Sequence, residues 1–273
     1  MSSNITTSLA WSSTIKKTMK NYQERWIHKF ELKKDKWVYV PSELTRSEGI
    51  KILNSLSTKW TPPVYFYHFR KGGHIEALKV HLDSYYFAYI DLKGFFNSTS
   101  RSRVSRALKE FYSYEQARNI AKMSTIKNPT DSRLAHILPF GFLQSPMLAT
   151  LCLHKSYLGN VLLELFNKKN VKISVYMDDI VISADDKDTL DVIYCKLIQC
   201  VEKSKYIISD KRTPPSTKIT VFNIEIEHHS LRITQKRMLE FLIEYIKTKS
   251  PYVKKGILTY IKTVNLEQYN YIK

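Results

Sequence analysis

The sequence is poor in cysteine, with only three such residues among 273, namely Cys152, Cys195 and Cys200. Their odd number and their lack of metal-type spacing argue against a disulfide framework or a zinc site, and they indicate reduced core thiols. Long apolar runs are also missing, since no segment approaches the roughly 18 apolar residues of a membrane span. The N-terminal stretch MSSNITTSLAWSSTIKKTMK lacks the uninterrupted apolar core of a signal peptide. We therefore expect a cytoplasmic protein without membrane contact.

Acidic residues are scarce relative to basic ones. The chain has 43 Lys and Arg against 25 Asp and Glu, a formal net charge of +18 and a pI near 9.6. This surplus indicates a polyanionic partner, and nucleic acid is the first candidate. An alternative is that a lysine-, isoleucine- and tyrosine-rich composition reflects a genome poor in G and C, with the charge incidental. The hydrophobic content of 43% is that of a globular chain.

No internal repeat or low-complexity linker interrupts the sequence, so the elements are expected to build one continuous mixed α+β unit. Apolar residues at helical spacing predict an amphipathic helix from Ser12 to Phe30 and another helix from Pro41 to Leu56. The stretch VYFYHFRKGGHIEALKV predicts a basic hairpin that bends at Gly72-Gly73.

The remaining segments continue this mixture of strands and helices. SYYFAYIDLKGFF predicts a strand that ends on Asp91, SRSRVSRALKEFYSYEQARNIAKM a helix, and SPMLATLCLHKSYLGNVLLELF one long apolar helix with Pro146 in its first turn. Asp188 is expected to cap the next helix. KITVFNIEIE and SLRIT predict a final strand pair, followed by a closing helix from Gln235 to Lys249.

The stretch VKISVYMDDIVISADD places two adjacent aspartates between two strand-forming runs. Alternating apolar residues on either side predict a hairpin with Asp178 and Asp179 at its tip. Two carboxylates so close resist ionising together unless a cation lies between them, and Mg²⁺ accepts one or two carboxylates plus substrate phosphates. Asp91 could supply a third carboxylate from a neighbouring strand and complete a two-metal site for phosphoryl transfer. The alternative is that Asp-Asp merely forms a good turn.

Three motifs together give the chain a resemblance to a known family. YIDLKGFF, LPFGFLQSPMLATL and YMDD follow one another in the order typical of reverse transcriptases, over roughly Arg70 to Ile233. The sequence is most similar to the compact bacterial enzymes, such as the retron, abortive-infection and other phage-defence reverse transcriptases. The resemblance implies an α+β right-hand polymerase fold, with fingers, an antiparallel palm sheet backed by helices, and a short or partial thumb.

The resemblance also implies domain limits, an activity and partners. It suggests N-terminal helices and a fingers hairpin in 1–83, palm in 84–100, a fingers insertion in 101–136, palm in 137–234 and a short thumb-like helical tail in 235–273. The implied activity is RNA-directed DNA synthesis from dNTPs with two Mg²⁺ ions, or Mn²⁺ as a substitute. The partners would be an RNA template, which could be a dedicated structured non-coding RNA, the DNA product, and a protein partner or second copy of the chain.

By resemblance, Asp91 and Asp178 would be the principal metal ligands, Asp179 a supporting acid, and the backbone carbonyl of Leu92 a further ligand. Five residues after Asp91, Phe96 would stand near the sugar of the incoming nucleotide, where its ring would clash with a 2′-hydroxyl. DNA rather than RNA would then be made. The alternative for Phe96 is a core position beside Phe95, since only one of the two rings can face the site.

The remaining expected site residues surround this centre. A basic residue near the leaving pyrophosphate could be Lys211 or Arg212, and Lys211 is favoured because an ammonium can donate a proton. The expected nucleotide-binding residues are Arg70, Lys71, Phe96, Phe140 and Gly141; for Arg70 and Lys71 the alternative is a solvated turn. Gly141 lacks a Cβ and would permit close approach to the template and nucleotide. The expected template or primer contacts are Gln144, Ser145, Pro146, Tyr176, Met177 and Phe222.

The sequence departs from the family pattern in three places. Phe140 stands where many members have Gln, FNIEI stands where Phe-Leu-Gly is commoner, and only about forty residues follow Thr234. Either a structured RNA or another protein supplies the missing grip, or the enzyme makes DNA without copying a template, primed on a protein hydroxyl. Conceivable acceptors are Tyr252, Tyr260, Tyr269 and Tyr271, although the alternative that they are ordinary helix and packing tyrosines is favoured. A further alternative is a catalytically silent nucleic-acid-binding module.

Overall fold

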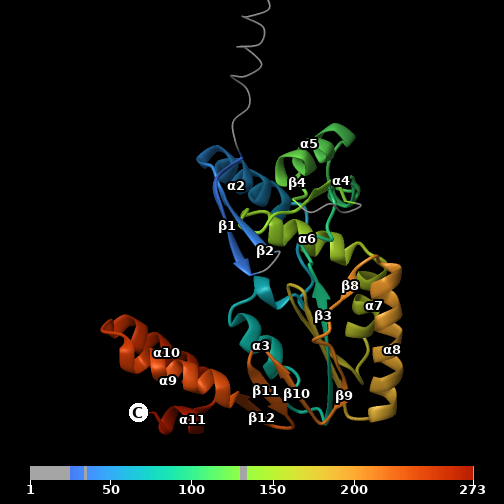
Figure 1. The fold of residues 1–273 in the computed structure, drawn as a ribbon. Coiled ribbons are helices and arrows are strands. Elements are labelled where there is room, and N and C mark those ends of the chain that lie inside the picture. The colour runs from blue at the N-terminus through green and yellow to red at the C-terminus, as the bar shows by residue number, and fades with distance from the viewer. Residues whose placement is uncertain (1–24, 34–35, 130–133, 273) are drawn as a thin grey trace, which may run out of the picture.

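A computed structural model describes residues 25–33, 36–129 and 134–272 of the chain. They form a mixed α+β fold with antiparallel sheets, as the sequence predicts (Figure 1). None of the helices in these ranges is long and apolar enough to cross a lipid bilayer.

The largest sheet is built around β3 (Tyr86–Lys93), which confirms the predicted aromatic strand. Its strands run in the order β6-β7-β3-β8, and β9 also pairs with β3. The partners of β3 are antiparallel: β7 (Asp179–Ala184), β8 (Ile207–Ile208) and β9 (Thr213–Ser216), while β6 (Lys172–Tyr176) pairs with β7. The hairpin predicted around the two aspartates is therefore β6 and β7.

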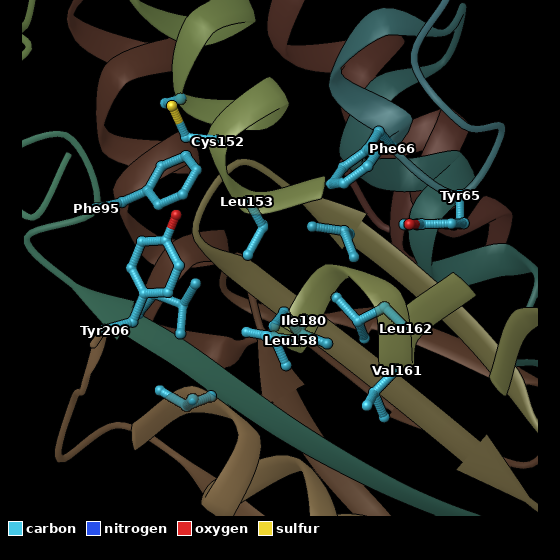
Figure 2. Close-up of a cluster of buried hydrophobic side chains, with 14 of the residues drawn as sticks. Tyr65, Phe66, Phe95, Cys152, Leu153, Leu158, Val161, Leu162, Ile180 and Tyr206 are labelled. Carbon is cyan, nitrogen blue, oxygen red and sulfur yellow. The ribbon is translucent and has the colours of Figure 1, made fainter. Parts of the chain in front are cut away.

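Successive residues of β3 face two different cores, because side chains alternate across a strand. Ala88, Ile90 and Leu92 belong to the larger core. That core lies under three helices: α6 (Ser145–His154), α7 (Tyr157–Phe166) and α8 (Lys187–Lys203). Figure 2 shows Leu153 of α6 and Leu158 of α7 beside Ile180 of β7.

The opposite face of the sheet carries Phe87 and Tyr89, which belong to a second core. This core is closed by α3 (Gly73–Lys79) and by a second sheet of β10 (Lys218–Val221), β11 (Ile224–Glu227) and β12 (Ser230–Ile233). The expected strand pair is thus a three-stranded meander. The chain reverses within KITVFNIEIE because Phe222 and Asn223 both adopt positive φ angles, 58° and 61°.

The helix predicted from Ser12 to Phe30 is wrong where the structure describes it, and residues 12–24 lie outside the described part. Trp26 to Phe30 belong to strand β1 (Trp26–Lys33), which pairs antiparallel with β2 (Lys36–Pro41). The aromatic residues of WIHKF fit a helical spacing, but pairing with KWVYV decides in favour of a hairpin. Helix α2 (Glu43–Ser57) confirms the second prediction and is capped by Ser42.

The basic hairpin predicted at VYFYHFRKGGHIEALKV is also wrong. The segment forms a short 3₁₀ helix, η1 (Tyr67–Phe69), and then α3. Gly72 adopts a φ of 87° and is the N-cap of α3 instead of the bend of a hairpin. Ile75 and Leu78 lie three residues apart and both enter the second core, which is the spacing of a helix.

Several predicted helices differ in their limits. Two segments that were expected to be single helices each form two helices. SRSRVSRALKEFYSYEQARNIAKM forms α4 (Arg101–Leu108) and α5 (Tyr114–Ser124), and SPMLATLCLHKSYLGNVLLELF forms α6 and α7. Ser113 and Ser156 cap the second helix of each pair. Asp186 caps α8, and Asp188 lies in its first turn. Two short strands, β4 (Ile126–Lys127) and β5 (His136–Ile137), pair beyond α5.

The chain ends in more helices than predicted. The closing helix α9 (Gln235–Lys247) is followed by α10 (Pro251–Val264) and α11 (Leu266–Asn270). Pro251 occupies the first turn of α10, where proline is well tolerated.

Candidate active site

The three aspartates singled out in the sequence come together at one end of the central sheet. Asp91 of β3 is the direct antiparallel partner of Asp179 at the start of β7. The backbone N–H of Leu92 donates to the carbonyl of Asp178 at 2.9 Å, and that of Ser209 donates to the carbonyl of Asp91 at 2.8 Å. The sheet register therefore fixes all three carboxylates beside one another.

The tip of the β6–β7 hairpin is held from outside the sheet. Met177 adopts a φ of 59°, and its backbone N–H donates to Nδ1 of His68 at 3.1 Å. Because Nδ1 accepts, Nε2 carries the ring proton and donates to the hydroxyl of Thr150 at 2.8 Å. Burial lowers the pKa of His68 to about 4, so the ring is neutral near pH 7. Sequence reasoning missed His68, because it lay in a segment expected to be a strand.

The negative charges of the three carboxylates are only partly balanced by the positively charged side chains around them. Burial, and then the charges of Asp178 and Asp91, raise the pKa of Asp179 to about 7 despite a hydrogen bond from the hydroxyl of Tyr89. Burial also raises the pKa of Asp178, and the charge of Asp91 adds to this. The groups that act in the opposite direction on Asp178 include the ammonium groups of Lys36 and Lys211. Such a cluster favours a bound cation.

The donor set suits a hard divalent cation that also binds substrate. The described part of the chain contains no group of three or more His, Cys, Asp or Glu side chains already arranged to hold a metal. Asp179 is engaged by Tyr89, which leaves Asp91 and Asp178 as the freer carboxylates. Mg²⁺ commonly takes one or two carboxylates and completes its shell with water and substrate phosphates. Asp91 and Asp178 therefore fit such an ion.

Of the two basic residues expected near the leaving group, the structure brings Lys211 to the site. Its Nζ lies 3.9 Å from Oδ2 of Asp91, and its side chain is 76% exposed. Arg212 lies near Tyr194 instead: burial raises the pKa of Tyr194, and the charge of Arg212 acts against that rise. Lys211 is thus free to reach a ligand bound at Asp91.

Phe96 and Phe140 form an aromatic wall near the carboxylates. Their ring centroids lie 4.5 Å apart in an edge-to-face arrangement. Phe95 and Phe96 both belong to the larger core, where the ring of Phe95 also lies near Tyr206. Phe96 is only 6% exposed. Nζ of Lys36 lies 4.3 Å from the centroid of Phe140. Lys36 therefore connects strand β2 to the site, and sequence reasoning missed it because β2 was not predicted.

Gly141 is required for a contact within the protein. Its φ is 102°, and a Cβ there would lie 2.1 Å from the carbonyl oxygen of Tyr39. The backbone N–H of Tyr39 donates to the carbonyl of Phe140 at 2.9 Å. The glycine thus permits the close approach of strand β2, which differs from the expected approach to template and nucleotide.

Two of the expected template contacts face the interior. Gln144 and Ser145 are each 1% exposed, and Nε2 of Gln144 donates to the hydroxyl of Ser124 at 3.3 Å. Their side chains therefore lie in the interior at the start of α6. Pro146 lies in the first turn of α6, as predicted, and its carbonyl accepts from Thr150.

Arg70 and Lys71 lie in the exposed turn between η1 and α3. The guanidinium of Arg70 donates to the carbonyl of Val64 at 2.8 Å and lies 4.6 Å from the ring centroid of Tyr67. These contacts are local, and the structure does not bring either residue to the aspartates in the way that it brings Lys36 and Lys211.

Tyr176 and Phe222, both expected at the primer or template, do meet. Their ring centroids are 5.4 Å apart, and the ring of His74 lies 5.3 Å from that of Phe222. Nε2 of His74 and the hydroxyl of Tyr260 in α10 are 3.1 Å apart. This aromatic cluster joins the C-terminal helices to the hairpin that carries Asp178.

The comparisons with solved structures include a viral protein and a telomerase. The foamy viral protease-reverse transcriptase in complex with an RNA/DNA hybrid matches 68% of this chain and 22% of its own, with 22% identity and a TM-score of 0.43. Telomerase from Candida albicans in complex with the TWJ fragment of telomeric RNA matches 97% of this chain and 59% of its own, with 11% identity and a TM-score of 0.53. The chain spans less than two thirds of either protein, and the telomerase likeness shows a shared fold. A search of curated protein sequences finds no significant match.

A family model described as reverse transcriptase (RNA-dependent DNA polymerase) matches residues 44–256. This match covers well over half of the chain and includes Asp91, Asp178, Asp179 and Lys211. With three aspartates gathered by the register of one sheet and a matching family model around them, the chain belongs to the reverse transcriptase family.

Proposed function

We propose that this chain is an RNA-directed DNA polymerase that adds deoxynucleotides to a primer end at Asp91, Asp178 and Asp179. The observation that carries the proposal is the direct pairing of Asp91 with Asp179, which brings three carboxylates together beside an exposed lysine. Burial and neighbouring negative charge raise the pKa of two of them, Asp178 and Asp179. Such a cluster has a chemical use when cations and phosphates occupy it together.

In this proposal the central sheet is the palm, comprising residues 84–100 and 137–234. The fingers comprise the segment before residue 84 and the insertion 101–136, and residues 235–273 form a short helical thumb. The fingers hairpin is β1 and β2, instead of the segment around Gly72, because β2 carries Lys36 toward the aspartates. The contact of Tyr260 with His74 would connect the thumb to the palm hairpin.

Two Mg²⁺ ions, or Mn²⁺ in their place, would be held chiefly by Asp91 and Asp178, with the carbonyl of Leu92 and the carboxylate of Asp179 in support. When bound, they would supply charge neutralisation for the attacking and leaving oxygens. Tyr89 would keep Asp179 oriented through its hydroxyl.

The protein side chains would bind and orient the other reacting groups. Lys211 would donate a proton toward the leaving pyrophosphate, since its ammonium is exposed and lies next to Asp91. Lys36 would neutralise the triphosphate from the fingers side, with Arg70 and Lys71 as more distant contributors. The wall formed by Phe96 and Phe140 would exclude the 2′-hydroxyl of a ribonucleotide.

Template and primer strands would pass over the exposed or half-buried parts of the motifs. Tyr176, Met177, Phe222 and Pro146 remain partly accessible, whereas Gln144 and Ser145 would act from the interior. The partner would be an RNA, including a dedicated structured RNA, and a protein partner or a second copy of the chain could bind as well.

Template-independent or protein-primed synthesis is a second candidate. It is favoured by the ring of Phe140, which has no amide to orient a template base and is covered by Lys36. Tyr252 and Tyr271 are 85% and 87% exposed and could accept a first nucleotide, whereas Tyr260 is engaged with His74. A catalytically silent nucleic-acid-binding module is disfavoured, because three carboxylates in a phosphate groove weaken binding unless cations accompany them.

A role in bacterial antiphage defence is supported by the resemblance to compact bacterial enzymes alone. Phage plating on cells that carry the wild-type chain or an Asp178→Asn variant would test it. Protection by wild type only would support the role, and equal plating would remove it.

The substrate is tested by purifying the protein with its bound nucleic acid and sequencing that RNA beside any DNA made with each dNTP in turn. DNA complementary to the RNA is expected. Product of a single repeated nucleotide, or product attached to the protein, would favour the second candidate. Absence of product with wild type, under conditions where the nucleic acid stays bound, would contradict polymerase activity.

A further inference from the structure

A basic pocket lies away from the aspartates, between α4, α5 and the start of β5. It has a volume of about 520 Å³. Its lining includes five side chains that carry or can carry positive charge: Arg101, Arg106, Lys109, Arg118 and His136. The other polar side chains in the lining are serine and tyrosine hydroxyls, and none of the described lining residues is Asp or Glu. Such a pocket is complementary to an anion with several oxygen acceptors.

A second basic pocket, of about 440 Å³, adjoins the first because Arg106 lines both. It adds four more cationic side chains: Arg103, Lys155, Lys203 and Lys205. Its single acidic lining residue, Glu110, is already paired with Lys155 at 2.6 Å. The two pockets therefore lie next to each other along α4, and the second extends to the C-terminal end of α8. We call this surface the α4 track.

Several cations of the α4 track are held in place by the protein. Nε of Arg101 donates to the hydroxyl of Thr125 at 2.8 Å. The guanidinium of Arg103 lies 4.4 Å from the ring centroid of Tyr206 and donates through Nη2 to the carbonyl of Ser204. The Nη1 of Arg103 is buried and has no hydrogen-bond partner within the described chain. Side chains ordered in advance lose less entropy on binding.

The charges near the first pocket repel one another. Arg25 donates to the carbonyls of Lys122 and Thr125, which places it close to Arg101. Burial lowers the pKa of Arg101, and the charge of Arg25 lowers it further. Burial and then the charges of Arg101, Arg25 and Lys127 lower the pKa of His136. A bound anion would relieve this repulsion in the same way that a cation relieves the aspartates.

The α4 track is spatially separate from the proposed thumb. In Figure 1, α4, α7 and α8 lie on the side of the molecule opposite α9 and α10. None of its lining residues belongs to the set around the aspartates, which comprises Tyr89, Lys36 and Lys211. A ligand on the track would therefore not contact the side chains around the aspartates.

We propose that the α4 track binds the phosphodiester backbone of a nucleic-acid strand outside the catalytic site. Two pockets that share Arg106, with seven Lys and Arg side chains besides the paired Lys155, suit a run of successive phosphates better than a single one, because several phosphates can each meet a cation. Hydroxyls and arginines are the usual protein donors to phosphate oxygens. The track would anchor a distant part of the RNA while another part is engaged at the aspartates.

The test compares two double variants, Arg106→Gln with Lys109→Gln and Lys203→Gln with Lys205→Gln. The charge-matched control is Lys168→Gln with Lys169→Gln, two exposed residues in the segment that follows α7. Affinity for an RNA hairpin and for a DNA duplex is measured in EDTA by fluorescence anisotropy over a series of salt concentrations. Losing two phosphate contacts should lower the slope of log affinity against log salt by about 1.8 for a duplex. At 0.1 M salt, this change corresponds to a loss in affinity of at least about tenfold.

Both track variants should show this loss and the control should not, and the ligand more strongly affected identifies RNA or DNA as the bound strand. Equal affinity and slope in wild type, control and both track variants, with unchanged melting temperatures, would overturn the proposal. So would tight binding of ATP or inorganic tripolyphosphate to wild type that is lost in the variants while nucleic-acid affinity is retained, since the track would then be a small-anion site.

The same proteins separate this proposal from the proposed polymerase activity. A template can be made too short to reach the α4 track while its primer end lies at the aspartates. Primer extension on such a template should proceed at the wild-type rate in both track variants. If wild type makes no DNA but the track variants still lose nucleic-acid affinity, the proposed function fails and the α4 track stands.

Discussion

Met177, at the tip of the hairpin that carries Asp178 and Asp179, donates its backbone N–H to Nδ1 of His68 at 3.1 Å. The other ring nitrogen of His68 contacts Thr150 of α6. One neutral imidazole thus ties the left-handed Met177 to the helix behind the site. We regard His68 as a positioning residue for the aspartates, because it touches their turn and not the reacting atoms.

Substitution of His68 tests this role with two matched variants. The amide oxygen of Asn can replace Nδ1 and accept from Met177, whereas the amide of Gln occupies the place of Nε2 and reaches Thr150. We expect His68→Asn to retain most of kcat and His68→Gln to lose about 100-fold, the effect of a displacement near 1 Å. Single-turnover rates and KM for dNTP separate positioning from binding. Equal rates for both variants, with matched melting temperatures, would remove the role.

The raised pKa of Asp179 predicts a pH-dependent stability in EDTA. The pKa of Asp179 is about 7 in the folded protein, above its ordinary value of 3.8. The folded protein therefore holds this proton more tightly than the unfolded chain. The resulting contribution to the free energy of unfolding is fully present below about pH 4 and is lost as the pH rises through 7. Asp179→Asn keeps an acceptor for Tyr89 without the charge, so it should melt at a higher temperature than wild type at pH 8. At pH 5 the two proteins should differ much less. Asp188→Asn, on the exposed face of α8, serves as the control, and a constant difference at both pH values would argue against the assignment.

Lys36 and Arg70 provide a direct comparison of two candidate phosphate-binding residues. Lys36 acts electrostatically on Asp178, whereas Arg70 is engaged by Val64 and Tyr67. We expect Lys36→Ala to raise KM for dNTP by about tenfold, which corresponds to about 1.4 kcal/mol, and Arg70→Ala to change it little. Steady-state kinetics at fixed primer and template concentration make the comparison. A larger effect of Arg70→Ala would restore the turn before α3 as the triphosphate contact.

Phe96 is predicted to select deoxynucleotides. Phe96→Val shortens the side chain and leaves an apolar residue against Phe140, so the fold should be better preserved than with Ala, which at buried sites costs about 3–5 kcal/mol. The ratio of kcat/KM for dCTP to that for CTP should fall by about tenfold or more. Phe140→Val removes the other ring of the same pair. A smaller change of the ratio in this variant than in Phe96→Val would show that Phe96 itself makes the selection. An unchanged ratio would transfer the selection to another residue.

The central part of the site could be predicted because local patterns determine it. Strand-forming residues in β3 and β7 and alternating apolar residues in β6 indicate the strands, and the register of the sheet brings Asp91 to Asp179. Lys211 could also be preferred over Arg212 from its chemistry. The identities of these residues and their positions in the strands were therefore enough to predict this part of the site.

The errors occurred where tertiary contacts decide between local alternatives. The residues of β1 fit a helical spacing, and only pairing with β2 makes them a strand. Gly72-Gly73 suits a hairpin bend, yet the left-handed Gly72 begins α3. Lys36 and His68 gain their roles from neighbours more than one hundred residues away, Phe140 and Met177, so no local pattern could identify them.

The proposed sharing of a divalent cation by Asp91 and Asp178 is tested most directly by Mn²⁺ binding, followed by electron paramagnetic resonance in the presence of a dNTP. Wild type should bind Mn²⁺, and both Asp91→Asn and Asp178→Asn should lose that binding, while the control Asp188→Asn should retain it. Mn²⁺ affinity that is the same in all four proteins would contradict a shared metal site at the end of the central sheet.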